Sequence, residues 1–431
     1  MKVSFIKYIF IISILQGFLM AATIKHVEID NLKVPVVFEQ DKSLPILNLQ
    51  LVFKNSGYMQ DKDKSGIASI SANLLNEGTK KLGSTKFATK LENEAISLHT
   101  SNGFETFVIE LSSLKDVHKD ALKLLKQLLE DPNYDEKTLE KIKTIAIGSL
   151  KRKENDYDFI ASSNLKKILF KDTPLENPSS GSIESISNIS LKDVKGFISK
   201  AIDLNNLIIV AGGDFEYEEL IKELEKVVKT IKNKKANKFK EFTANSTAKV
   251  DTILKDTQQA YIYFGSPFDI DSNDKNVYKA KVASFILGGS GFGSRLMEEI
   301  RVKRGLAYSA YGYISINKSH SFFTGYLQTK LESADEAKEL VSTIVNEFVK
   351  SGVTQEELDS AKSFLLGSEP LRTETLSQRL HRAFTLFYRG LEQDYPQKEL
   401  ENIENLKLED LNDYIKSHKE IIDLSYSIVR K

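Results

Sequence analysis

The order of apolar and polar positions predicts strands followed by helices, and this order occurs twice along the chain. In the first half, Val-, Ile- and Phe-rich runs predict strands, and runs with apolar residues every three or four positions predict helices. The predicted strands are "VEIDNLKVPVVFE" (27–39), "ILNLQLVFKN" (46–55), "ETFVIELSSL" (105–114) and "NLIIVAGG" (206–213). The main predicted helices are 118–131, 137–153 and 216–231.

The second half repeats this plan. Its predicted strands are 259–268, 307–316 and 321–329, with a helix over 277–287 and further helices from residue 334 onward. Strands and helices mixed in this order favour an α+β fold. We therefore predict two homologous lobes, each a largely antiparallel sheet with helices packed on one face, together forming half of a clamshell.

Internal similarity indicates that the two halves arose by duplication. Residues 134–149 align with 353–368, and residues 183–198 align with 400–415. Both alignments have an offset of roughly 220 residues, and two matches in order at one offset argue against chance. The predicted division is an N-terminal lobe over 23–230, a linker over 231–249 and a C-terminal lobe over 250–431.

The first 22 residues have the pattern of a signal peptide. Lys2 and Lys7 precede an apolar run from Tyr8 to Met20, and Ala21 and Ala22 follow it. This run is short for a bilayer span and favours export with cleavage at Ala21 or Ala22, which predicts a periplasmic protein. An uncleaved signal that tethers the chain to the membrane is the alternative.

Charge and composition exclude some function classes. The chain has 60 basic and 60 acidic residues and no cysteine. The zero net charge and the lack of a basic stripe argue against nucleic acid as a partner. The Lys-rich segment 231–249 is typical of an exposed linker, with a binding patch as the alternative.

Local motifs for metal, phosphate and nucleophilic chemistry are missing from the sequence. The six histidines are scattered, and no two have the spacing that places a pair on one helical face. The segment "GGSGFGSR" (288–295) lacks the spacing of a nucleotide-binding loop and is typical of a glycine turn. No G-x-S-x-G elbow is present either.

Two stretches nevertheless resemble motifs of one family, the pitrilysin/insulinase-type zinc peptidases. "SGIASISANLLNEGT" (65–79) is similar to the helix with the inverted zinc motif, G-L-A-H-x-x-E-H-x-x-x-x-G-T. The resemblance places the two zinc-binding histidines at Ser69 and Asn73, the glutamate base at Ala72 and a later zinc-binding glutamate at Ser149. These residues supply neither imidazole nor carboxylate, so we expect no metal and no catalytic residue on this chain alone.

The second stretch keeps its motif almost intact. "SRLMEEIRVKRGLAYSAYGY" (294–313) resembles S-R-L-x-x-x-[IL]-R-x-x-x-G-L-A-Y-S, whose Arg and Tyr fall on Arg301 and Tyr308. In the family this pair binds the substrate backbone near the zinc. By composition alone, arginines on a helix usually face solvent, and that reading stays open.

The resemblance implies a division of labour between two chains. We expect a non-catalytic subunit of a periplasmic zinc peptidase heterodimer, which binds a peptide substrate while a homologous partner carries zinc and the H-x-x-E-H motif. The alternative is a peptide-binding or assembly clamp without an enzymatic partner, including self-association. An independent zinc endopeptidase fits least well, because the ligands are missing.

Overall fold

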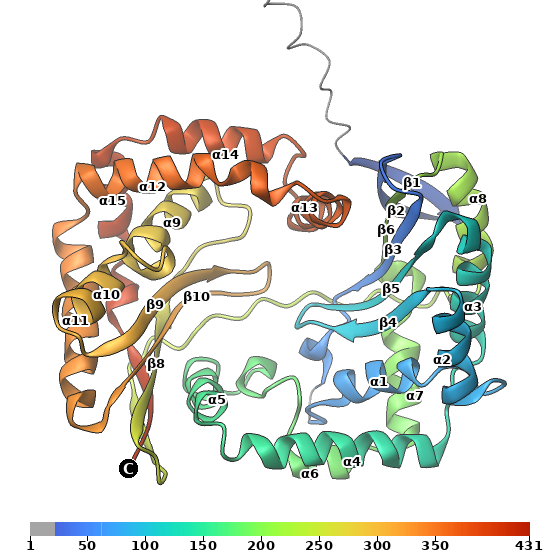
Figure 1. The fold of residues 1–431 in the computed structure, drawn as a ribbon, viewed down its shortest axis with the longest axis horizontal. Coiled ribbons are helices and arrows are strands. Elements are labelled where there is room, and N and C mark those ends of the chain that lie inside the picture. The colour runs from blue at the N-terminus through green and yellow to red at the C-terminus, as the bar shows by residue number, and fades with distance from the viewer. Residues whose placement is uncertain (1–21, 62) are drawn as a thin grey trace, which may run out of the picture.

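The computed structural model describes residues 22–61 and 63–431, and it forms two lobes around one sheet each (Figure 1). The N-terminal sheet has six strands in the order β1-β2-β6-β3-β5-β4. Its strands are β1 (Thr23–Ile29), β2 (Leu32–Gln40), β3 (Ile46–Lys54), β4 (Ser97–Asn102), β5 (Thr106–Leu114) and β6 (Leu207–Gly213). The predicted signal peptide, apart from Ala22, lies outside the described residues.

The C-terminal sheet repeats the same topology. Its order is β7-β11-β8-β10-β9, with β7 (Val250–Leu254), β8 (Gln259–Pro267), β9 (Ala307–Ile316), β10 (Ser321–Lys330) and β11 (Ser425–Arg430). With β1 set aside, the two orders correspond strand for strand. The one parallel pair also recurs, because β2 pairs with β6 as β7 pairs with β11. The predicted fold of two homologous α+β lobes is confirmed.

Each sheet is covered mainly by helices of its own lobe. The N-terminal helices are α1 (Ile67–Asn76), α2 (Gly83–Asn93), α3 (His118–Glu130), α4 (Glu136–Lys153), α5 (Tyr157–Leu169), α6 (Ile183–Ser187), α7 (Leu191–Ala201) and α8 (Tyr217–Val228). The C-terminal helices are α9 (Val277–Ser284), α10 (Arg295–Met297), α11 (Ala334–Ser351), α12 (Gln355–Gly367), α13 (Leu376–Arg389), α14 (Tyr395–Glu404) and α15 (Leu408–Ser417). Among the described residues, none of these helices has the length and apolar character needed to cross a bilayer.

Strand β6 explains why one predicted strand is apolar at every position. All seven of its residues are buried. Leu207 and Ile209 face the main core with α1, α3, α7 and α8, whereas Ile208 and Val210 face the opposite side of the sheet. A strand buried on both faces has no polar alternation, and its pattern is therefore continuous.

The second face of each sheet is covered by a helix from the other lobe. Leu376 and Leu380 of α13 pack on Val37 and Val210 of the N-terminal sheet. The equivalent helix of the first repeat, α5, packs on β8 and β11 of the C-terminal sheet. Figure 1 shows both crossings, with α13 and α5 at opposite ends of the interface between the lobes. This reciprocal exchange joins the two lobes through apolar contacts.

The two lobes also meet at the tips of equivalent hairpins. Glu105, between β4 and β5, accepts hydrogen bonds from the backbone N–H and hydroxyl of Ser319, between β9 and β10, at 2.7 and 2.5 Å. His320 is packed among aromatic rings of both lobes, including Phe104 of the N-terminal lobe and Phe322 of the C-terminal lobe. Residues 231–249 hold no helix or strand, and their Phe242 N–H donates to the Ser319 carbonyl.

Candidate functional site

The helix predicted to carry the degenerate zinc motif is α1, which lies along the edge strand β4. Asn76 of α1 fixes this position, because its amide nitrogen donates to the Thr100 carbonyl and its amide oxygen accepts from the Thr100 N–H, at 3.0 and 2.7 Å. Ser69 is half-buried and donates to the side-chain oxygen of Asn102 at 3.3 Å. Ala72 is buried, whereas Asn73 is exposed to solvent.

The fourth zinc-motif position, Ser149, is half-buried on α4, and α4 packs against α1. The donor set of Ser69, Ala72, Asn73 and Ser149 does not fit zinc, which takes imidazole, thiolate or carboxylate ligands. Across residues 22–61 and 63–431, no group of three or more His, Cys, Asp or Glu side chains could hold a metal ion. The chemistry of these positions therefore supports neither metal-activated water nor a general base.

The start of α1 explains why the frame of the motif persists without its ligands. Gly66 has a φ of 93°, and a Cβ there would lie 2.6 Å from the side chain of Ile186. Asp61 accepts hydrogen bonds from the N–H groups of Gly66 and Ala68 at 2.7 and 3.2 Å. Burial raises the pKa of Asp61 to about 7, although these two hydrogen bonds act in the opposite direction. The glycine and the cap serve the fold.

The predicted Arg–Tyr pair is brought together in the C-terminal lobe. The guanidinium carbon of Arg301 lies 4.5 Å from the centroid of the Tyr308 ring and 4.7 Å from that of Phe292. Tyr308 is 82% exposed and Phe292 is 69% exposed. Arg301 thus lies between two solvent-facing aromatic rings, which hold it by cation–π attraction while its N–H groups stay available as donors.

A helix cap and an ion pair fix the position of the segment that carries Arg301. Ser294 caps α10, which continues into a π-helix over Glu298–Lys303. Arg295 makes a bidentate pair with Glu357 at 2.6 and 2.7 Å, which ties this segment to α12. Arg304, which is more exposed, pairs with Glu299. Single-turn π segments inside helices often occur at functional sites.

The glycine-rich turn before this segment has a packing role. A Cβ on Gly288 would lie 2.5 Å from the backbone nitrogen of Gly312 on β9. The glycine therefore allows the end of a helix to approach the strand closely. Gly288 and Gly289 belong to a helical segment, Phe285–Gly289, so the turn predicted from residue 288 begins only after Gly289. Phe292, in the middle of this turn, lies at the surface beside Arg301.

Tyrosines line the sheet next to the Arg–Tyr pair. Tyr311 and Tyr326 have ring centroids 5.5 Å apart, and Tyr326 and Tyr263 have centroids 4.7 Å apart. The hydroxyl of Tyr263 donates to Asp158 of α5 at 3.4 Å. Burial, followed by the nearby charge of Asp158, raises the pKa of Tyr263, so its phenol stays protonated and can donate.

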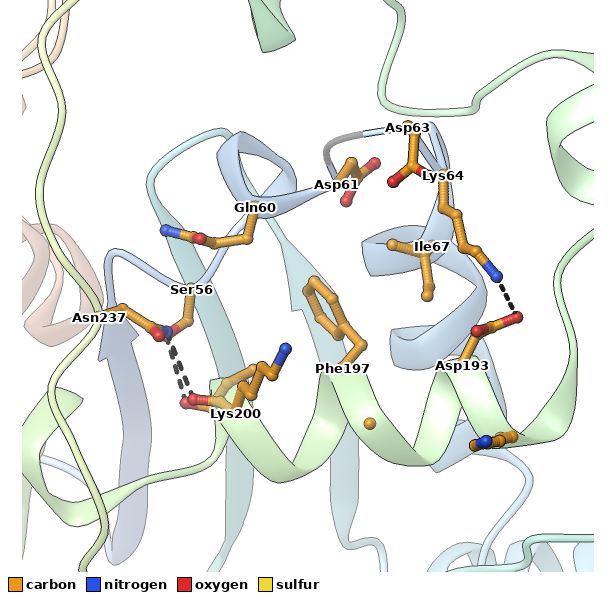
Figure 2. Close-up of a pocket in the computed structure, with 13 residues that line it drawn as sticks. Ser56, Gln60, Asp61, Asp63, Lys64, Ile67, Asp193, Phe197, Lys200 and Asn237 are labelled. Carbon is orange, nitrogen blue, oxygen red and sulfur yellow. Dashed lines mark hydrogen bonds and ion pairs between the residues drawn. The ribbon is translucent and has the colours of Figure 1, made fainter.

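A separate cavity of about 460 Å³ lies between the start of α1 and α7 (Figure 2). Lys64 and Asp193 form an ion pair across it at 2.5 Å, and the hydrogen bond from Lys64 helps to lower the pKa of Asp193 to about 2. Lys192 and Lys200 add positive charge and Asp63 adds negative charge, whereas Asp61, with its pKa raised to about 7, is only partly ionised at neutral pH. None of the predicted site residues lines this cavity.

The predicted positions therefore form two groups in different lobes. Ser69, Ala72, Asn73 and Ser149 belong to the N-terminal lobe, and Arg301 and Tyr308 belong to the C-terminal lobe. Sequence reasoning missed Phe292, whose only signal is a large apolar residue in a glycine turn, and it missed Asp61, which precedes its helix by six residues.

Comparisons with known proteins identify the family of the chain. Residues 35–182 match the insulinase family, peptidase family M16, and residues 188–365 match the peptidase M16 inactive domain. A curated relative from Helicobacter pylori (strain ATCC 700392 / 26695), named non-peptidase homolog YmxG, is 43% identical over 97% of this chain and 98% of its own length.

Solved structures show the same architecture. The peptidase M16 inactive domain from Pseudomonas fluorescens has a TM-score of 0.87 at 25% identity, covering 95% of this chain and 98% of that one. The periplasmic protease PqqL from Escherichia coli has a TM-score of 0.76 at 12% identity, and the match covers 95% of this chain and 48% of that one. The chain belongs to the insulinase family of peptidases, M16, as a member in which the zinc-motif positions hold no metal ligand.

Proposed function

We propose that this chain is the non-catalytic subunit of a zinc-dependent peptidase pair in the periplasm. In this proposal Arg301 and Tyr308 bind the backbone of a peptide substrate, and a homologous partner chain supplies zinc and the H-x-x-E-H motif. The observation that carries the proposal is the contrast between the two lobes. The zinc-motif helix has kept its fold and lost its ligands, whereas the Arg–Tyr pair is intact and exposed.

The chemistry of the pair suits a peptide carbonyl. A guanidinium and a phenol both donate hydrogen bonds, and a carbonyl oxygen accepts more strongly as negative charge develops on it. Arg301 stacks on both Phe292 and Tyr308, and these two contacts limit the orientations of its guanidinium before a substrate binds. Two donors with restricted geometry lose little conformational freedom on binding.

The fold supports a pair of chains. This chain has the architecture of about half of PqqL, a protease whose single chain is roughly twice as long. A second homologous chain would complete the same arrangement, with the two halves facing each other around a peptide. Zinc on the partner would activate water, and this chain would hold the carbonyl that the water attacks.

Co-expression with a zinc-motif homologue tests the proposal. We expect hydrolysis of an unstructured peptide by the purified pair and none by either chain alone. Arg301→Ala or Tyr308→Phe should lower kcat by about 100-fold while the pair still elutes as one species. Arg304→Ala, whose guanidinium pairs with Glu299 and does not stack on Tyr308, and Tyr217→Phe, in the N-terminal lobe, are matched controls. Unchanged turnover in both site variants would disprove the assigned role.

Two further measurements address the alternatives. A stable homodimer that binds peptides without a zinc-bearing partner would favour a clamp over an enzyme subunit. For localisation, N-terminal sequencing of the chain from the periplasmic fraction should give a start directly after Ala21 or Ala22. Recovery of the intact N-terminus in the membrane fraction would indicate a tether instead.

A further inference from the structure

A second cavity, of about 520 Å³, lies in the C-terminal lobe between α9, α13, α14 and the end of β9. Its size is in the range of small-molecule and short-peptide sites. Ile314 and Ile316 of β9 contribute to its apolar wall, together with Leu386, Leu391 and Pro396. Tyr308, on the same strand, is six residues before Ile314, or about 20 Å away along an extended strand. The cavity is therefore separate from the Arg–Tyr pair.

Charge in this cavity is unbalanced. The lining contains four side chains with permanent positive charge, Lys281, Arg372, Arg382 and Arg389, against two carboxylates, Glu369 and Glu399. Glu399 is paired with Lys281 at 2.6 Å, and Glu369 is paired with Arg382 and also, at 4.0 Å, with Arg372. Both carboxylates of the lining already have a basic partner.

Arg389 is the basic group left without a carboxylate partner. Its guanidinium donates to the backbone carbonyl of Ile316 at 2.7 Å, and among residues 22–61 and 63–431 it forms no ion pair within 4.0 Å. Burial lowers the pKa of Arg389, although Glu105 and Glu399 act in the opposite direction. A half-buried arginine with free donors beside an apolar wall favours the binding of an anion.

We infer that this cavity binds the C-terminal carboxylate of a short apolar peptide, with Arg389 as the anchor for the carboxylate. The apolar wall at Ile314 and Leu386 would receive the last side chain. Thr385 also lines the cavity; its hydroxyl donates to the His381 carbonyl at 2.9 Å, and its oxygen can accept a hydrogen bond from a peptide N–H group. The oxygen of Ser284, by contrast, already accepts from the Ile314 N–H at 3.0 Å. A peptide uses the polar group of Thr385, whereas the chain of a fatty acid cannot. This site requires neither Arg301 nor a partner chain.

One wall of the cavity is formed by α13, which also packs on the N-terminal lobe. Thr385 and Arg389 lie on α13, the helix whose earlier residues Leu376 and Leu380 cover the N-terminal sheet. A ligand on Arg389 would therefore contact the helix that joins the two lobes.

Fluorescence can test the site directly, because the chain has no tryptophan. Tyr395→Trp places a single reporter in the lining and leaves Thr385 and Arg389 in place. We expect N-acetyl-leucyl-leucine with a free carboxylate to change its emission and to bind at least about tenfold more tightly than the matched C-terminal amide. In the same background, Arg389→Met should remove this preference, and Arg152→Met, on exposed α4 surface, should retain it.

Three results would contradict the proposed carboxylate site or the class of its ligand. Equal affinity for acid and amide, or unchanged affinity in Arg389→Met, would overturn the inference. Tighter binding of decanoate than of the peptide acid would overturn the peptide class of the ligand. If Arg389→Met fails to fold, as judged by its melting temperature, the acid–amide comparison in the Tyr395→Trp protein still decides. Because no zinc-bearing partner is needed, failure here and failure of the proposed peptidase role are distinguishable.

Discussion

Arg301 and Tyr308 stack on each other at the surface of the C-terminal lobe, with the guanidinium carbon 4.5 Å from the ring centroid. The sequence places them seven residues apart, on a π-helix and on the strand that follows it. Gly305 lies between the two elements and has a φ of 63°, a left-handed backbone conformation that favours glycine. The pair is a preformed unit and does not need a partner to assemble it.

Phe292 should position Arg301 from the other side. Phe292→Ala removes one of the two rings, and an exposed cation–π contact is worth about 0.5–1 kcal/mol. We expect kcat/KM of the reconstituted pair to fall about two- to fivefold, with Phe292→Tyr close to the wild type. Steady-state kinetics with one peptide would measure this. Equal values for the Ala and Tyr variants would show that the ring does not position Arg301.

Restoring three ligands should restore zinc binding without hydrolysis. Ser69 and Asn73 are one helical turn apart on α1, and α4, which carries Ser149, packs against α1. The triple variant Ser69→His, Asn73→His, Ser149→Glu should hold one zinc per chain by elemental analysis, and the wild type should hold none. Hydrolysis should need Ala72→Glu as well, because the base is otherwise missing.

A two-ligand control makes the zinc experiment specific. The double variant without Ser149→Glu keeps both histidines and lacks the carboxylate, so it should lose zinc on dialysis against a weak chelator. If the double and triple variants bind zinc equally, the metal is held elsewhere and Ser149 is not the fourth position of the site.

The pattern of the sequence predicts the two lobes well, because each repeat buries its own sheet. Alternating or continuous apolar runs define strands such as β6, whichever helix covers the second face of the sheet. The exchange of α5 and α13 between lobes is different. The apolar face of α13, with Leu376 and Leu380, is readable from the sequence, but periodicity does not specify which sheet the face covers. That choice depends on contacts between residues more than 160 positions apart, such as Leu376 and Val210.

The residues of the candidate site are likewise only partly predictable from the sequence. The spacing of Arg301 and Tyr308 is readable because a short helix–turn–strand unit fixes their relation locally. Phe292 is not readable, since a glycine-rich turn has many backbone conformations and only the folded structure places its ring on Arg301. Asp61 caps α1 through a turn of several residues, so its role lies outside the usual N-cap position.

Arg295 and Arg304 should differ in their importance for stability. Arg295 and Glu357 have side chains only 20% and 26% exposed, and Arg295 also donates to the Gly352 carbonyl at 2.8 Å. We expect Arg295→Met to lower the free energy of unfolding by about 2–3 kcal/mol, since a half-buried bidentate pair is broken. Arg304→Met should cost less than about 1 kcal/mol, because Arg304 is 43% exposed. Urea unfolding would compare them; equal costs would contradict this ranking.

His320 should make the junction between the lobes sensitive to acid. Burial lowers the pKa of His320 from 6.5 to about 4, although Glu105 acts in the opposite direction and Lys166 acts with burial. Between these two pH values the unfolded chain binds a proton that the folded chain does not. Stability therefore rises with pH across this window and is lost as the pH falls from about 6.5 to about 4.

The variant His320→Gln isolates this effect. Asp61 titrates in an overlapping window with the opposite sign, because its raised pKa of about 7 makes stability fall as the pH rises from about 4 to 7. The wild-type profile alone could therefore be flat. We expect the unfolding free energy of the wild type minus that of His320→Gln to fall by on the order of 1 kcal/mol for each pH unit between 6.5 and 4. Urea unfolding at pH 4.5, 5.5, 6.5 and 7.5 would measure this difference, and a constant difference would mean that His320 does not titrate in this window.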